Sequence, residues 1–149
     1  MDKTLIIILV IIAVLVGVGF YVFNKPAEIN NQNQNMQNTT QPELKIEILK
    51  EGTGEEAKVG DNIVVNYTGT FENGEKFDSS LNPGREPFPY TLGQNMVIKG
   101  WEMGLLGMKV GEKRKLTIPY ELAYGEAGRP PQIPAKSTLI FEIDMLSIN

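Results

Sequence analysis

The segment from residue 44 to 149 predicts an α+β domain, in which a curved antiparallel sheet packs on one helix. Five short stretches are rich in β-branched and aromatic residues or alternate between apolar and polar ones, as strands do. One further stretch carries apolar residues at helical spacing, and Asn73-Gly74 is a strong hairpin signal. A sheet with one apolar face is stabilised by packing on such a helix.

The strands and the helix follow one another in a simple order along this segment. Leu44, Ile46 and Ile48 alternate with charged residues, so the first strand is expected to be half-buried. Val97, Trp101 and Leu105 recur every four residues, which predicts one amphipathic helix over 97–106. The five expected strands are 44–48, 62–71, 88–92, 112–118 and 138–146.

Composition excludes several classes of chemistry. The chain has no His and no Cys, so it lacks the commonest general base, the commonest transition-metal ligand and any thiol nucleophile. A net charge of −4 argues against nucleic acid as a main partner, because phosphate binding needs a basic surface. Catalysis must therefore rely on carboxylates, hydroxyls, Lys or shape, although Ser79 or Ser80 with a Lys remains formally possible for a hydrolase.

The N-terminal region predicts a membrane anchor. Leu5 to Phe23 contains 19 residues without a charge, an amide or a Pro. A helix of that length spans roughly 28 Å, close to the hydrocarbon thickness of a bilayer. The aromatic residues Phe20, Tyr21 and Phe23 suit a membrane interface. We therefore expect residues 1–23 to form a single transmembrane helix.

Two other interpretations of this apolar run stay open. A buried core helix would need a polar face, which the run lacks. A signal peptide cleaved near Gly17 or Gly19 would instead give a secreted protein. For an uncleaved anchor, the four-residue tail before the run favours an inside N-terminus and an extracytoplasmic domain.

A polar spacer separates the apolar run from the domain. Asn24 to Pro42 contains six Asn and four Gln in 19 residues, and such a composition has little to bury. We therefore expect three parts, which are an anchor (1–23), a disordered linker (24–43) and a folded domain (44–149).

Aromatic residues are the main functional signal of the domain. Nine of them lie within its 106 residues. A domain this small buries only a modest core, so some aromatic side chains can line an apolar cleft instead.

An ordered set of short motifs then identifies a family resemblance. The motifs are VNYTG (65–69), KFDSS (76–80), FPYTLG (88–93), VIKGWE (97–102), MKVGE (108–112), LAYG (122–125), IP (133–134) and TLIFEI (138–143). The chain resembles the FKBP family of macrolide-binding peptidyl-prolyl cis/trans isomerases over essentially all of residues 44–149. The resemblance implies a five- or six-stranded antiparallel sheet wrapped around the helix, with an apolar cleft between them.

The resemblance also implies which residues form the site. Trp101 would form the floor of the cleft under the prolyl ring, and Asp78 would lie near the substrate carbonyl. The Tyr124 hydroxyl would form a hydrogen bond with the bound polypeptide. The implied catalytic set is Tyr67, Phe77, Asp78, Trp101, Tyr124 and Phe141, and the implied substrate-binding set is Phe88, Val97, Ile98 and Ile133. For each aromatic residue and each aliphatic one, plain core packing is the alternative.

The implied function is isomerisation of X–Pro bonds in exported or membrane-proximal proteins, without a metal or cofactor. Proline-containing polypeptides would be the partners, and macrolides would be inhibitors. A non-catalytic proline-binding module or chaperone on the same fold is the alternative. The chain departs from the family pattern at Met96, at Arg129 and Gln132 in the loop over the cleft, and by one extra residue before Phe88, so that Arg85 matches the loop Arg only approximately.

Overall fold

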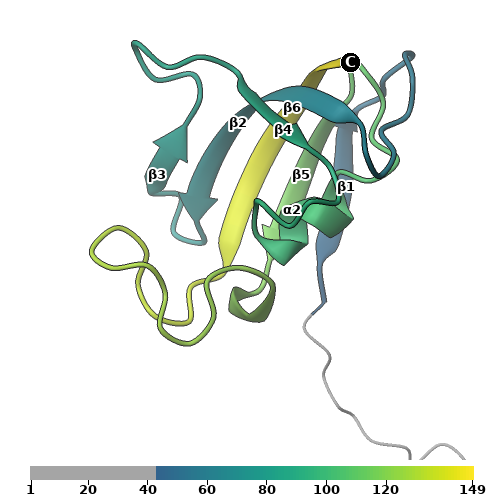
Figure 1. Ribbon diagram of the computed structural model, residues 1–149. Helices are drawn as coiled ribbons and strands as arrows, with labels where there is room; N and C mark the ends of the chain where they lie inside the picture. Colours follow the sequence, from purple (N-terminus) through teal and green to yellow (C-terminus); the bar gives the residue numbers. More distant parts are fainter. Residues whose placement is uncertain (1–42) are drawn as a thin grey trace, which may run out of the picture. The chain divides into compact units, whose positions relative to one another are not determined.

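The computed structural model describes residues 43–149, and these form one six-stranded antiparallel sheet with one short α-helix (Figure 1). The strands are β1 (Lys45–Lys50), β2 (Asn62–Phe71), β3 (Lys76–Ser79), β4 (Phe88–Thr91), β5 (Lys113–Ile118) and β6 (Leu139–Ile148). The helix is α2 (Lys99–Gly104), and a single 3₁₀ turn, η2 (Tyr120–Leu122), follows β5. This architecture confirms the sheet and the single helix of the predicted fold class.

The sheet order is β1-β5-β6-β2-β3, and β4 pairs with β2 beyond the end of β3. The central strands β2 and β6 pair along nine positions, from Ile63 opposite Ile148 to Phe71 opposite Leu139. β3 and β4 therefore share one edge of β2, with β3 at residues 68–70 and β4 at residues 62–65. The chain between them crosses from one end of β2 to the other.

Alternation along the strands sends one set of side chains to the core. In β2 the buried positions are Ile63, Val65, Tyr67 and Gly69, and in β6 they are every second residue from Leu139 to Met145. Because strand side chains alternate between the two faces, this pattern gives the sheet one apolar face. α2 packs on that face and completes the core.

Two glycines allow the helix to lie unusually close to the sheet. Gly100 faces Ile118, and Gly104 faces Leu116, both from β5. A Cβ added at Gly104 would lie 2.5 Å from Leu116 Cδ1, which is too short for a real contact. Because neither glycine has a side chain, the α2 backbone lies directly against β5. This close approach fixes how far Trp101 reaches toward the sheet.

A buried ion pair holds the end of this helix. The Arg114 guanidinium donates to Glu112 (2.6 Å) and to the Gly104 carbonyl at the end of α2 (2.6 Å). Glu112 is 2% exposed and Arg114 is 7% exposed, and the second carboxylate oxygen accepts from the Lys109 N–H (2.9 Å). Losing either partner would leave a buried charge without compensation, which is strongly destabilising.

Three details differ from the sequence expectations. The helix is shorter than 97–106, because Ile98 is extended and Gly107 turns the chain at a positive φ of 70°. β3 was not expected, since four residues with a single Phe show no periodicity. The prediction of a half-buried first strand was wrong, because β1 lies at the sheet edge, with Ile46 and Ile48 each 48% exposed.

The predicted anchor (1–23) and nearly all of the predicted linker (24–43) lie outside the described residues. Within residues 43–149, no helix has the length and apolar character needed to cross a membrane.

Gly104→Ala is expected to lower the free energy of unfolding by about 1–2 kcal/mol, because overpacking against Leu116 outweighs the gain in helix propensity. Met103→Ala, at an exposed position on the same helix, serves as the control and should change it by less than about 0.5 kcal/mol. Denaturant unfolding of both variants measures the difference. A Gly104→Ala protein as stable as the parent would contradict the close packing of α2.

Candidate active site

A cleft of about 250 Å³ opens between the apolar face of the sheet, α2 and the loop that follows η2. Its walls are mainly aromatic and aliphatic, with one carboxylate and one guanidinium. The lining residues are Tyr67, Phe77, Asp78, Phe88, Met96, Val97, Ile98, Trp101, Tyr124, Arg129 and Phe141. Small, mostly apolar clefts with a few polar groups are typical binding sites.

Trp101 lies at the centre of the aromatic walls. It is 4% exposed, and its ring meets Phe141 edge to face at 5.2 Å and Tyr67 at 5.3 Å between centroids. Phe88 adds a third edge-to-face contact at 6.1 Å. Each such pair is worth about 0.5–1.5 kcal/mol beyond the burial of its area, so these contacts hold the indole in one orientation.

A glycine in β2 makes room for two of the walls. A Cβ on Gly69 would lie 2.6 Å from Phe77 Cζ and 2.9 Å from Phe141 Cε1. These two rings meet edge to face at 5.6 Å, directly over the glycine. The Gly of the VNYTG motif therefore lets both rings rest on the sheet and form one side of the cleft.

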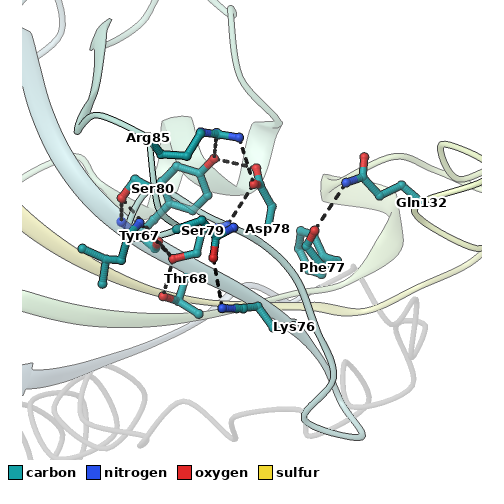
Figure 2. Close-up of polar contacts among 11 residues, drawn as sticks. Tyr67, Thr68, Lys76, Phe77, Asp78, Ser79, Ser80, Arg85 and Gln132 are labelled. Atoms are coloured by element: carbon teal, nitrogen blue, oxygen red, sulfur yellow. Dashed lines mark hydrogen bonds and ion pairs between the residues drawn. The ribbon is translucent and has the colours of Figure 1, made fainter.

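A polar network occupies one wall (Figure 2). The Tyr67 hydroxyl donates to Asp78 Oδ2 (2.6 Å) and accepts from Arg85 (3.2 Å), while Asp78 Oδ1 accepts from the Ser79 N–H (2.9 Å). Arg85 also pairs with Asp78 at 3.4 Å. Asp78 is thus oriented from three directions and presents a fixed carboxylate to the cleft.

The hydroxyl of Tyr67 stays protonated. Burial, followed by the hydrogen bond to Asp78, raises the pKa of Tyr67 to about 12. Burial also raises the pKa of Tyr90, with a smaller contribution from Glu102. Both tyrosines are therefore neutral throughout the physiological range, and Tyr67 acts as a hydrogen-bond donor rather than as a base.

The loop after η2 forms the far rim. Arg129 and Ile133 exchange backbone hydrogen bonds of 2.8 and 3.0 Å, so the loop closes as a small hairpin. The Gln132 amide reaches across to the Phe77 carbonyl at 3.4 Å, as Figure 2 shows. Tyr124, at the base of this loop, lines the cleft.

Nine of the ten site residues expected from the sequence line this one cleft. Ile133 is the exception, since it lies 4% exposed in the core beneath the loop. Met96 and Arg129 also line the cleft but were not among the expected site residues, although Met96 directly precedes Val97 and the sequence placed Arg129 in the loop over the cleft. The sequence also matched Arg85 only approximately, whereas the structure brings this residue to Tyr67 and Asp78.

The two serines do not form a nucleophile. Ser79 Oγ donates to the Tyr67 carbonyl (2.9 Å), and Ser80 Oγ contacts the Tyr67 N–H (2.9 Å) and the Asn66 amide oxygen (3.0 Å). These bonds tie β3 and its following turn to β2. No Lys lies among their partners in the described part of the chain, which disfavours the hydrolase alternative.

Comparison with known proteins decides the family. The model of the family described as FKBP-type peptidyl-prolyl cis-trans isomerase matches residues 53–146. This chain belongs to that family. An FK506-binding protein of Neisseria meningitidis serogroup A is 55% identical over 105 residues, which cover 70% of this chain and 95% of that protein. The FKBP domain thus accounts for nearly all of that relative.

Other relatives extend beyond the shared domain. The human peptidyl-prolyl cis-trans isomerase FKBP2 is 55% identical over 92 residues, or 62% of this chain and 64% of that protein. This chain therefore spans just under two thirds of the length of such relatives. Among solved structures, AtFKBP13 aligns with a TM-score of 0.66 at 39% identity, over 71% of this chain and 93% of that one. FkpA from Escherichia coli gives 0.65 at 45% identity, over 71% and 48%.

Trp101→Leu is expected to keep the FKBP fold. It should weaken binding of proline peptides, and any isomerisation of them, about tenfold or more, because the aromatic walls lose the indole ring that they contact edge to face. Peptide titration and denaturant unfolding measure the two effects separately.

Leu105→Ala is the control for a purely structural effect. Leu105 is fully buried one turn along the chain but does not line the cleft. Its truncation should cost about 2–5 kcal/mol of stability and leave peptide affinity intact in the folded fraction. Unchanged affinity in folded Trp101→Leu would mean that the floor of the cleft is elsewhere.

Proposed function

We propose that this protein catalyses cis/trans isomerisation of X–Pro bonds in polypeptides, and that the cleft around Trp101 is the catalytic site. The observation that carries the proposal is the combination of apolar aromatic walls with a single oriented carboxylate, Asp78, in one cleft. Family membership supports the same activity, since the curated relatives include proteins named peptidyl-prolyl cis-trans isomerases.

The reaction suits a cleft without a nucleophile or a base. The barrier to rotation is about 18–20 kcal/mol and comes from the partial double-bond character of the peptide C–N bond. Twisting removes amide resonance and reduces charge separation in the carbonyl. An apolar cleft destabilises the planar, more polar amide relative to the twisted one. Aromatic walls that fit the twisted peptide add differential binding, and each 1.36 kcal/mol gives tenfold in rate.

Each lining group then has a specific task. Trp101 supports the prolyl ring from below, while Tyr67, Phe77 and Phe141 enclose it. Asp78, held by Tyr67 and Arg85, is the polar group near the substrate carbonyl. The Tyr124 hydroxyl forms a hydrogen bond with the bound polypeptide. Phe88, Val97 and Ile98 extend the apolar wall, whereas Ile133 supports the rim from the core.

A proline-binding module without catalysis is the second candidate, because the same walls could bind a prolyl ring without favouring the twisted form. Macrolide binding follows from the same cleft, since relatives in Neisseria meningitidis are named FK506-binding proteins. An isomerisation assay on proline peptides separates the two functions, because a module would bind them without accelerating exchange.

We also propose a three-part organisation, with a transmembrane anchor (1–23), a linker (24–43) and the isomerase domain (44–149). The apolar run from Leu5 to Phe23 supports the anchor, and the short N-terminal tail supports an extracytoplasmic domain. The clients would then be exported or membrane-proximal proteins. Secretion after signal cleavage is the alternative.

The rate constant kcat/KM for an X–Pro peptide is expected to be nearly flat from about pH 6 to 8.5, because the mechanism transfers no proton and the chain has no His or Cys. The raised pKa of Tyr67, about 12, keeps its hydroxyl protonated over this whole window. A pH–rate profile checks this. A limb of slope near one in that window, persisting in Asp78→Asn, would contradict the mechanism.

Full-length protein is expected in the membrane fraction and should resist carbonate washing, because a spanning helix is held by the hydrophobic effect rather than by charge. Fractionation of expressing cells followed by immunoblotting measures this. Recovery of a soluble product that begins near Phe20 would instead indicate a cleaved signal peptide.

A further inference from the structure

A second hollow adjoins the cleft and shares part of its wall. Its lining residues are Asn95, Met96, Val97, Ile98, Lys99, Ala123, Tyr124 and Arg129. Met96, Val97, Ile98, Tyr124 and Arg129 line both spaces. A polypeptide whose proline occupies the cleft therefore has neighbouring residues within reach of the hollow, since a chain advances only about 3.3–3.6 Å per residue.

Arg129, on the wall that the cleft and the hollow share, is held in place by contacts of both its backbone and its side chain. Its backbone exchanges two hydrogen bonds with Ile133, and its guanidinium carbon lies 5.9 Å from the centre of the Tyr124 ring. That distance is within the range of a cation–π interaction. The guanidinium is thus oriented over the Tyr124 ring before any substrate binds, which reduces the entropy lost on pairing with a ligand.

The hollow carries positive charge without an opposing carboxylate. Lys99 and Arg129 are both exposed, and no Asp or Glu lines the hollow. Neither cation forms an ion pair with any residue from 43 to 149, whereas Glu126 on the same loop pairs with Lys136 at 3.3 Å. Asp78, the carboxylate of the cleft itself, is paired with Arg85.

This local charge is opposite to that of the domain. Residues 43–149 contain 12 basic and 16 acidic residues, so the positive charge at the hollow is not a consequence of overall composition. Pairing with an incoming carboxylate would be favourable there, because two cations line the same hollow and the guanidinium can donate two hydrogen bonds to a carboxylate.

We propose, on the basis of the proposed isomerase function, that the enzyme prefers X–Pro segments with Asp or Glu within two residues of the proline, and that Arg129 and Lys99 determine this specificity. The prolyl ring occupies the aromatic cleft, and the neighbouring carboxylate enters the hollow between the two cations. The preference concerns recognition and leaves the isomerisation step to the residues around Trp101.

The test uses the purified full chain and pairs of peptides that differ only by Glu or Gln at one position, within two residues on either side of the proline. Exchange between isomers, followed by NMR, gives kcat/KM for each peptide. At low salt, the Glu peptide of the best pair should be preferred about two- to fivefold, which corresponds to a partly exposed charge pair. The ratio should fall as salt screens the pair.

Variants assign the preference to the two cations. Arg129→Gln and Lys99→Gln should each lower the Glu-to-Gln ratio, the double variant should bring it to about one, and Arg129→Lys should keep part of it. Lys136→Gln, a cation on the same loop that does not line the hollow, should leave both the ratio and the activity unchanged.

Two results would overturn the specificity proposal. One is isomerisation of all peptides with a ratio near one at every position, and the other is a preference that survives in the double variant. Failure to isomerise any peptide would instead overturn the proposed function on which this inference rests.

Discussion

The close approach of α2 to β5 is the contact on which the rest of the site depends. Gly100 and Gly104 bring the helix backbone against Ile118 and Leu116, and Arg114 bonds the last carbonyl of the helix from the same strand. Trp101 projects from this helix toward the apolar face of β2 and β6, where it meets Tyr67 and Phe141 edge to face. If α2 lay further from β5, the cleft would be wider and more hydrated, and Trp101 would not be held at its base.

The same contact explains why the cleft can be both apolar and well ordered. The aromatic rings pack against one another, and the one carboxylate of the cleft, Asp78, is paired with Tyr67, Arg85 and the Ser79 N–H, which hold it in a fixed position. A rigid, poorly hydrated cleft favours a twisted amide over a planar one, since it stabilises the less polar state without a proton transfer.

The features that the sequence could predict are those with a periodic or local physical cause. β-branched and aromatic composition over 62–71 predicted β2, alternation over 138–146 predicted β6, and the four-residue spacing of Val97, Trp101 and Leu105 predicted the helix. The motifs contain most of the residues that line the cleft.

The position of Arg85 was harder to predict, because this residue lies in a turn without periodicity and reaches the site through its long side chain. Edge exposure of β1 was also hidden, since alternation reports two faces but not whether a neighbouring layer covers one. Ile133 was assigned to the wall because a motif gives proximity to the cleft but not the direction of a side chain.

The central claim is that a prolyl ring binds on Trp101, and the chain offers a direct probe of it because this is its only tryptophan. Titration of the full chain with an X–Pro peptide should change the intrinsic tryptophan emission saturably, with a midpoint equal to the peptide dissociation constant measured by calorimetry. A peptide of the same sequence with Ala in place of Pro should leave the emission unchanged. Calorimetric binding of the proline peptide with no change in emission would contradict the account, because the ring would then bind away from Trp101.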